Sequence, residues 1–162
     1  MRCIGKLYAC VRARTMAVVR LHSDGYIMDT VDTATRSRMM SGIKGKNTSP
    51  ELIVRRYLHG KGYRYRLHRR DLPGSPDIVL PRLKTCIFVH GCFWHRHDGC
   101  TYAAVPKTRP EFWSQKFERN VRRDKENIEA LESAGWNVVI VWECEVKSGT
   151  FKRIVDQLKI DR

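Results

Sequence analysis

Residues 89–100 hold the densest set of reactive side chains in this sequence. These twelve residues include two of the six cysteines, three of the six histidines and an adjacent Phe-Trp pair. A hydrophobic core does not require thiols and imidazoles at this density, whereas protein metal sites are built from them. Aromatic rings beside arginine are also typical of surfaces that bind nucleic acid. The segment therefore predicts a metal site and a binding surface within one loop.

Three residues of this loop, Cys92, His97 and Cys100, have the Cys-x4-His-x2-Cys spacing of a zinc site. A structural zinc is tetrahedral, so a fourth ligand must come from elsewhere, and Cys144 is the best candidate because it follows an apolar strand. Four protein ligands leave no open position, so we expect such a zinc to be structural rather than catalytic. Unrelated free thiols are the alternative interpretation.

Two carboxylates fall in apolar surroundings, where an ionised group is costly unless it binds a partner. Asp77 opens a short apolar strand after a Pro-Gly turn, and a hard cation such as Mg²⁺ is a natural partner for it. A carboxylate that caps the turn is the alternative.

Asp124 interrupts the apolar stripe of a helix, and His90 and His95 are the imidazoles available to it. An Asp–His pair suits a general base that deprotonates water, whereas a buried salt bridge to an arginine is the alternative.

Three aromatic residues, Phe93, Trp94 and Trp113, have Lys and Arg residues close to them in the sequence. Apolar rings in such a setting can wedge between base pairs and unstack them. Ordinary core packing is the alternative, and it is the stronger interpretation for Trp113 taken alone.

Elements that could position these groups follow from the hydrophobic periodicity and from the turn residues. Asp32 or Thr33 can cap a first helix, and the Ser49 hydroxyl can cap a second one. The expected elements are helices at 35–43 and from 49 to the glycines at 60 and 62, strands at 63–68, 77–80 and 85–89, a long helix at 111–133, a buried strand at 136–142 and a last helix from 151 to 158. The strands at 77–80 and 85–89 look like a central hairpin that leads into the Cys/His loop. This order predicts an α/β domain with a mixed sheet.

Composition points to a polyanionic partner. The 162 residues include 31 Lys and Arg against 17 Asp and Glu, for a net charge of +14. A positive electrostatic field of this size favours binding to nucleic acid, whereas a solvated basic surface is the alternative.

No apolar run in the sequence is long enough to span a membrane. Residues 1–28 are basic and lack the apolar core of a signal peptide, so we expect a disordered or non-native extension, a single domain over 29–162 and a cytoplasmic protein.

Six sequence blocks together resemble one family. In chain order they lie at 34–37, 72–77, 90–95, 111–113, 120–124 and 141–144. In this order they are similar to the very short patch repair (Vsr) DNA mismatch endonucleases over about residues 32–146. The Gly-Cys-Phe-Trp-His block at 91–95, followed by Val-Trp-Glu-Cys at 141–144, is the most specific part of the resemblance.

The resemblance implies a core like that of type II restriction endonucleases, with a central mixed sheet flanked by helices and a structural zinc site. It implies an Mg²⁺-dependent enzyme that nicks one strand 5′ to the T of a T:G mismatch. Such mismatches arise by deamination of 5-methylcytosine, and the nick initiates very short patch repair. A non-catalytic zinc-containing DNA-binding module and a restriction-type nuclease without mismatch preference are the alternatives.

Site roles follow from the same resemblance. Asp77 and the backbone carbonyl of Val89 correspond to Mg²⁺ ligands, and Glu51 reaches that site through water. His95 corresponds to the residue that activates water, Asp124 supports it, and His90 lies at the scissile phosphate.

The resemblance also implies the zinc ligands and the DNA contacts. The zinc ligands are Cys92, Cys100 and Cys144 with either His97 or Asp98, because this loop is one residue longer than in some relatives. Phe93, Trp94 and Trp113 correspond to rings that intercalate from the major groove, and Met40 to a minor-groove contact. The remaining expected DNA contacts are Lys116, Arg119, Asn120 and Arg123.

Expected partners are double-stranded DNA that carries a T:G mismatch, mismatch-repair proteins, a cytosine-5 methyltransferase and a downstream DNA polymerase. We expect a monomer that has no membrane contact and is associated with the nucleoid when it is bound to DNA.

Overall fold

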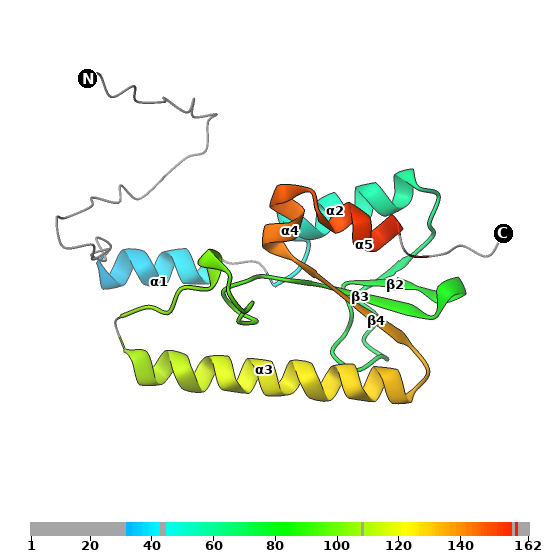
Figure 1. Ribbon diagram of the computed structural model, residues 1–162. Helices are drawn as coiled ribbons and strands as arrows, with labels where there is room; N and C mark the ends of the chain where they lie inside the picture. The colour runs from blue at the N-terminus through cyan, green and yellow to red at the C-terminus, as the bar shows by residue number, and fades with distance from the viewer. Residues whose placement is uncertain (1–31, 43–44, 108, 157, 159–162) are drawn as a thin grey trace, which may run out of the picture. The chain divides into compact units, whose positions relative to one another are not determined.

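The computed structural model describes residues 32–42, 45–107, 109–156 and 158 (Figure 1). The chain divides into two compact units, residues 1–43 and 44–162. The expected extension at 1–28 lies outside the described residues, and the single domain over 29–162 stays a prediction.

Helix α1 (Thr33–Ser41) belongs to the first unit. The Asp32 carboxylate accepts hydrogen bonds from two backbone N–H groups of the first turn, both at 2.9 Å. Asp32 rather than Thr33 is therefore the cap, as one of the two expected alternatives. Met40 lies in α1, but its side chain lies outside the described part of the chain.

Four strands form one mixed sheet in the order β1-β2-β3-β4. They are β1 (Arg66–Leu67), β2 (Ile78–Leu80), β3 (Thr85–His90) and β4 (Asn137–Trp142). β1 pairs with β2 and β2 with β3 in antiparallel orientation, whereas β3 and β4 run parallel. The expected hairpin and the expected mixed sheet are both confirmed.

Helices cover both faces of this sheet. Figure 1 shows α3 (Pro110–Ser133) along one face and α2 (Ser49–Gly60), α4 (Glu143–Ser148) and α5 (Phe151–Asp156) on the other. Short 3-10 turns lie at Pro81–Leu83 and Thr101–Ala103. The α/β class is confirmed, while the likeness to restriction endonucleases stays a prediction. Helix α4 was not expected. It has six residues, of which Val146 is the buried one, so no helical stripe marks it in the sequence.

Side chains of the strands alternate between two cores. The core on the side of α2 and α5 contains Val54, Leu58, Ile78, Leu80, Ile87, Val141, Phe151 and Val155. The core on the side of α3 contains Val79, Cys86, Phe88 and Leu131. Successive strand residues face opposite sides of a sheet, so the spacing of Cys86 and Phe88 also brings His90 to the α3 side. Cys86 is fully buried, as expected.

The expected strand at 63–68 is wrong in length, because Arg66–Leu67 alone pairs with β2. The N–H of Tyr63 instead donates to the Leu58 carbonyl at 3.0 Å, which continues the turn at the end of α2. His68 has a φ of 46°, in the left-handed region, and this ends the extended run. Alternation in the sequence detects neither constraint.

The expected cap of α2 at Ser49 is also wrong, because the cap is Thr48. The Thr48 hydroxyl accepts the N–H of Glu51 at 3.5 Å, and the Glu51 carboxylate accepts the N–H of Thr48 at 3.2 Å. These two bonds form a capping box, which holds the Glu51 side chain at the start of the helix.

Two apolar segments are less buried than expected. In β4, Val141 is the fully buried residue, and its neighbours are half-buried or exposed. Trp113, Phe117 and Leu131 of α3 are buried as expected, but Val121 of the same stripe is 44 % exposed. Val121 lines a cavity beside the histidines of the Cys/His loop, which explains its exposure.

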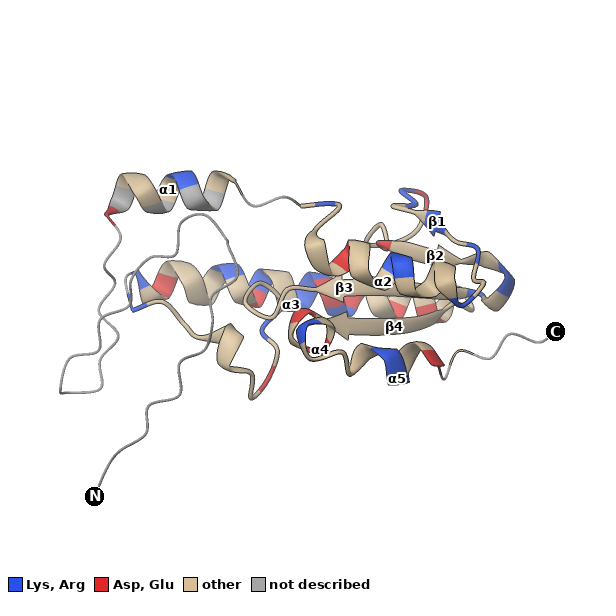
Figure 2. Cartoon of the chain, turned by 90° about the horizontal axis from the view of Figure 1, so that it is seen from above, with Lys and Arg blue, Asp and Glu red and all other residues tan. Residues whose placement is uncertain are grey.

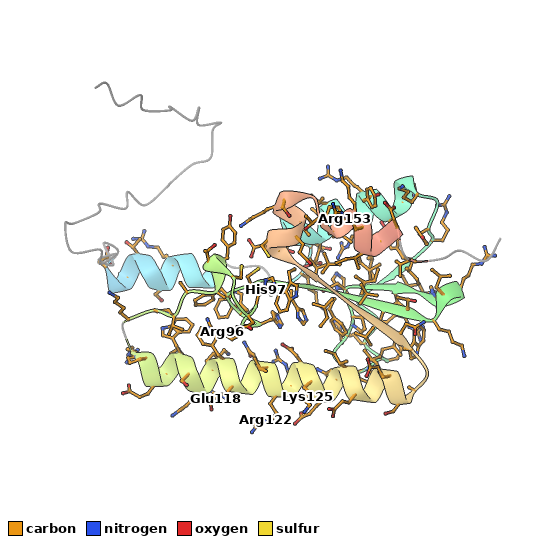
Figure 3. The ribbon with its side chains drawn as sticks, viewed as in Figure 1. Arg96, His97, Glu118, Arg122, Lys125 and Arg153 are labelled. Atoms are coloured by element: carbon orange, nitrogen blue, oxygen red, sulfur yellow. The ribbon has the colours of Figure 1, made fainter. Side chains whose placement is uncertain are left out.

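Opposite charges mix along α3 (Figure 2). Arg122 and Lys125 pair with acids four residues further on, at 4.0 and 3.7 Å, and Figure 3 shows both side chains pointing away from the sheet. Within the described residues, no helix is both long enough and apolar enough to cross a membrane.

Candidate functional site

The loop after β3 folds back on itself through short-range hydrogen bonds. The carbonyl of Gly91 accepts the N–H groups of Trp94 and His95, both at 3.1 Å. The Cys92 carbonyl accepts the N–H of His97 at 3.1 Å, and Arg96 between them takes a φ of 54°. This winding sends neighbouring side chains in different directions, so one short segment can serve several purposes.

Helix α3 holds this loop from one side. The buried side-chain amide of Asn120 donates to the Trp94 carbonyl at 3.0 Å. The Arg96 guanidinium lies over the Phe117 ring at 4.7 Å and also donates to the Ala103 carbonyl. In Figure 3, Arg96 lies toward α3, whereas His97 lies nearer to α4.

A thiol-rich cluster holds the loop from the other side. Ligand atoms of Cys92, His97, Cys100 and Cys144 all lie within 4.8 Å of one another. His97 Nδ1 is 3.7 Å from the Cys92 sulfur and 3.3 Å from the Cys144 sulfur. Asp98 is exposed and does not belong to this cluster. The structure therefore gathers the imidazole rather than the carboxylate with the three thiols.

The geometry of this cluster fits a tetrahedral ion. Zn–S and Zn–N distances of about 2.3 and 2.0 Å separate sulfur and nitrogen ligands by about 3.5 Å, which falls between the two distances observed. Burial raises the pKa of the Cys92 thiol to about 12, and it also raises the pKa of Cys144. A bound cation is the kind of partner that would stabilise these thiolates near neutral pH.

A second cluster consists of His90, His95 and Asp124, whose ligand atoms also lie within 4.8 Å of one another. His95 Nδ1 is 2.5 Å from an oxygen of Asp124, so the expected Asp–His juxtaposition is present. His90 stacks on His95 with ring centroids 3.8 Å apart. Burial lowers the pKa of His90 to about 4, with a further contribution from His95. His90 is therefore neutral near pH 7 and adds no positive charge against its neighbour.

A cavity of about 380 Å³ opens beside these two histidines. Its walls combine apolar side chains of α3 and β4, among them Val121 and Ile140, with Asp124 and two glutamates of α3. The Asp–His pair is thus accessible from solvent without being fully exposed.

The third cluster contains Glu51, His68 and Asp77, again with ligand atoms within 4.8 Å. Asp77 accepts the N–H of Val89 at 2.8 Å through one oxygen, while its other oxygen is 3.9 Å from His68 Nδ1. Burial raises the pKa of Asp77 to about 6, and the charge of Glu51 adds to the increase. His68 has a lowered pKa, first through burial and then through the charge of Arg55.

The second and third clusters are neighbours. His95 is close enough to Asp77 for its charge to lower the pKa of that carboxyl, against the larger effect of burial. Asp77 directly precedes β2, Val89 lies in the adjacent strand β3, and His90 follows Val89 directly. A carboxylate, an Asp–His pair and the end of β3 therefore share one region of the molecule.

The three expected wedge residues form an aromatic cluster. The Phe93 ring lies edge-on to Trp94 at 5.0 Å, to Trp113 at 5.3 Å and to Phe117 at 5.1 Å. Phe93 and Trp94 are half-buried, whereas Trp113 is 8 % exposed and supports the other two from α3. Phe112, next to this cluster, is 51 % exposed.

The expected DNA contacts on α3 divide into two kinds. Lys116, Arg119 and Arg123 recur at helical spacing along one side, with Arg119 and Arg123 exposed. Asn120 is buried and contacts the loop backbone, so its geometry positions Trp94 rather than presenting an amide to solvent.

Two residues near these clusters, Arg55 and Trp142, were not singled out from the sequence. Arg55 is buried and joins Glu51 to His68. Trp142 stacks on His97 at 4.2 Å and lies edge-on to His90 at 5.4 Å, so it touches both the thiol cluster and the histidine pair. The spacing of four between Glu51 and Arg55 is a signal that could have revealed the ion pair.

Comparison with known proteins identifies the family. Residues 28–101 match the family described as "DNA mismatch endonuclease Vsr". The type II nicking enzyme V.XorIIP of Xanthomonas oryzae pv. oryzae is 49 % identical over 118 residues, which cover 73 % of this chain and 86 % of that protein. The DNA mismatch endonuclease Vsr of Escherichia coli is 40 % identical over 134 residues, covering 83 % and 84 %. Because the similarity spans most of each protein, the chain belongs to the DNA mismatch endonuclease Vsr family.

Proposed function

We propose that this protein nicks one DNA strand 5′ to the T of a T:G mismatch by Mg²⁺-dependent hydrolysis, with His95 as the general base. The observation that carries the proposal is the half-buried Asp77 carboxylate, which lies near a His95–Asp124 pair whose Nδ1 and carboxylate oxygen are 2.5 Å apart. A DNA-binding module without catalysis has no need for two carboxylates in these settings. Family membership adds that DNA is the substrate.

Asp77 and the Val89 carbonyl are the groups that would hold the cation. The N–H and C=O of one strand residue point to the same neighbouring strand. Because the Val89 N–H donates to Asp77, its carbonyl also faces that carboxylate. A bound Mg²⁺ supplies positive charge that polarises the phosphate and stabilises the leaving oxygen.

The remaining chemistry belongs to the histidine pair. Asp124 accepts a hydrogen bond from the Nδ1–H of His95, which leaves Nε2 with a lone pair to take a proton from the attacking water. Neutral His90 packs against the ring face and keeps His95 in this orientation. The position of His90 beside the His95–Asp124 pair also suits contact with the scissile phosphate.

A structural zinc on Cys92, His97, Cys100 and Cys144 would hold the loop between α3 and α4. A firmly held loop gives Phe93 and Trp94 a rigid support from which to unstack bases. Unstacking costs about a few kcal/mol and costs least at a weakened pair, so a T:G mismatch would be preferred. Lys116, Arg119 and Arg123 would hold backbone phosphates, which predicts a steep dependence of binding on salt.

A nicking assay tests the reaction. One labelled duplex carries T:G, T:A or C:G at the same site, with Mg²⁺ present or omitted. We expect nicking of the T:G duplex that requires Mg²⁺, and a loss of about 10²- to 10⁴-fold in His95→Ala. His59→Ala is the matched control, because His59 is exposed on α2 and belongs to none of the three clusters. Near-normal nicking by His95→Ala or by Asp77→Ala would refute the assigned roles.

Mismatch preference has its own test. Trp94→Ala should lower the ratio of T:G to T:A nicking while the protein retains its zinc, because Trp94 is not a thiol-cluster residue. An unchanged ratio would remove Trp94 from mismatch recognition. If the wild-type chain binds mismatched DNA without nicking it under any divalent cation, the non-catalytic binding module replaces the present proposal.

A further inference from the structure

A buried arginine connects the start of α2 to the proposed Mg²⁺ site. From its hydrogen bonds we infer that Arg55 holds His68 as a neutral donor, whose Nδ1–H is directed at a phosphate oxygen of the DNA beside Asp77. His68 is then an additional substrate-contacting residue and Arg55 a positioning residue. The inference rests on the proposed nuclease function, which supplies the phosphate.

Glu51 is fully occupied by protein donors. One of its oxygens accepts the N–H of Asn47 at 3.0 Å and Arg55 Nη2 at 2.6 Å. The other accepts the N–H of Thr48 at 3.2 Å and the Thr48 hydroxyl at 2.9 Å. A carboxylate offers about four acceptor sites, so Glu51 has none left for a metal ion. Its role is to anchor Arg55, which makes any influence on the metal site indirect.

Arg55 sets the tautomer of His68. Its Nη2 lies 3.0 Å from His68 Nε2, and a guanidinium donates hydrogen bonds but accepts none. His68 Nε2 must therefore carry the lone pair, and the proton resides on Nδ1. The side-chain amide oxygen of Asn47 lies further from the same nitrogen, at 3.5 Å, and already accepts a hydrogen bond from Arg55 Nη1 at 2.6 Å. The shorter contact decides in favour of Arg55 as the partner of Nε2.

The Nδ1–H group then faces Asp77. Its distance to the nearer carboxylate oxygen is 3.9 Å, which is too long for a hydrogen bond. Among the described residues this N–H has no acceptor, although the side chain is only 18 % exposed. An Nδ1 that carries a proton has no lone pair for a metal, so His68 does not act as a ligand while Arg55 holds it. An acceptor oxygen supplied by a ligand completes the arrangement.

A phosphate oxygen is the acceptor that this environment favours. The donor lies beside the proposed cation site, where an anionic oxygen is held at the same time. The Arg55 guanidinium behind the ring adds positive charge, and the chain as a whole carries +14. Fixed donors directed at developing negative charge are a main source of catalysis in phosphoryl transfer and related reactions.

Single-turnover nicking of a T:G duplex tests the inference. His68→Ala should reduce the rate about 10²-fold, as the loss of one such donor does elsewhere. His68→Asn keeps an amide N–H near the position of Nδ1 and should recover to within about tenfold of wild type. The Mg²⁺ concentration for half-maximal rate should stay unchanged in both variants. Exposed His59→Ala again serves as the control.

Three results would overturn the inference. An increase in the Mg²⁺ requirement of His68→Ala, with rescue at high Mg²⁺, would make His68 a metal ligand. Equal loss in the Ala and Asn variants would make its role structural. A ¹⁵N NMR spectrum of His68 that shows the Nε2–H tautomer would contradict the contact with Arg55. If instead wild-type protein fails to nick, the proposed function fails, while the NMR spectrum still tests the tautomer.

Arg55 has a separate test. Arg55→Lys keeps the positive charge but loses the rigid fork, in which Nη1 contacts Asn47 and thereby orients Nη2 toward Glu51 and His68. It should nick as slowly as His68→Ala, and the double variant should be no slower than either single one, because both remove the same contact. Additive losses would show that the two residues act independently.

Discussion

The thiol cluster and the third cluster, here called the carboxylate cluster because it contains Glu51 and Asp77, both gather metal-ligating side chains within 4.8 Å. Protein partners occupy the ligand atoms of the two clusters to different degrees. In the thiol cluster, the buried Cys92 has a pKa of about 12, so without a cation it remains a protonated thiol. In the carboxylate cluster, Glu51 has four donors and one oxygen of Asp77 accepts from Val89. The proposed zinc would therefore complete the first cluster, whereas protein donors already hold most of the second.

Metal removal should have the largest effect, and its consequences for the fold should differ between the two clusters. A zinc-selective chelator should unfold the loop and abolish nicking, because zinc contributes about 10–16 kcal/mol in small structural sites and a domain has about 5–15 kcal/mol in total. Omission of Mg²⁺ should abolish nicking and leave the circular dichroism spectrum and melting temperature almost unchanged. The comparison breaks if both treatments have the same effect on the fold.

Next in size is the loss of a single thiol. Cys144→Ser should reduce the zinc content and lower the melting temperature by more than about 10 °C, since the other three ligands leave the site open. Cys86→Ala is the matched control, because Cys86 is buried in the core outside the cluster and should keep its metal. Metal analysis with a thermal scan distinguishes the two, and full zinc in Cys144→Ser would exclude this ligand.

Asp77→Asn tests the carboxylate cluster, because the stability difference between this variant and the wild type should depend on pH. Burial raises the pKa of Asp77 from 3.8 to about 6, so the folded state favours the protonated form and the ionised form destabilises the fold as pH rises. Without divalent cations, the variant should be more stable than wild type by roughly 2–3 kcal/mol at pH 7.5. That difference should fall to about half at pH 5.

Urea unfolding at the two pH values measures this difference. Saturating Mg²⁺ should stabilise the wild type and not the variant, because the cation binds the ionised carboxylate. An Asp77→Asn protein that is less stable than wild type at pH 7.5 would contradict the cost assigned to this carboxylate.

The smallest expected effect concerns the contact between the loop and α3. Asn120→Ala leaves the Trp94 carbonyl without its buried donor, which should cost about 1–3 kcal/mol. Zinc content should not change, because the thiols hold the other side of the loop. Mismatch preference should fall with the position of Trp94. Loss of zinc in this variant would show that the two sides of the loop are not independent.

Local sequence patterns were sufficient to predict most of the fold and the members of the thiol cluster. Cys-x4-His-x2-Cys spacing, together with a cysteine after an apolar strand, was enough to choose four side chains that the fold brings together. Strand alternation and the helical stripe identified the mixed sheet, the hairpin and α3, because these elements are determined mainly by which residues can be buried. The expectations that failed, Ser49 as a cap and a strand over 63–68, depended on hydrogen bonds that local periodicity does not encode.

The sequence by itself determined which chemistry was available: thiols and imidazoles in one loop, two carboxylates in apolar settings and an excess of basic residues. Only the tertiary structure decided how these groups combine. In the fold, His97 rather than Asp98 lies among the three thiols, and His95 contacts Asp124, which is 29 positions away in the sequence. Arg55 contacts His68, whose other ring nitrogen faces Asp77. The reason is physical: a side chain's type is written in the sequence, whereas its partner and its tautomer depend on atoms brought close by packing of the sheet and its helices.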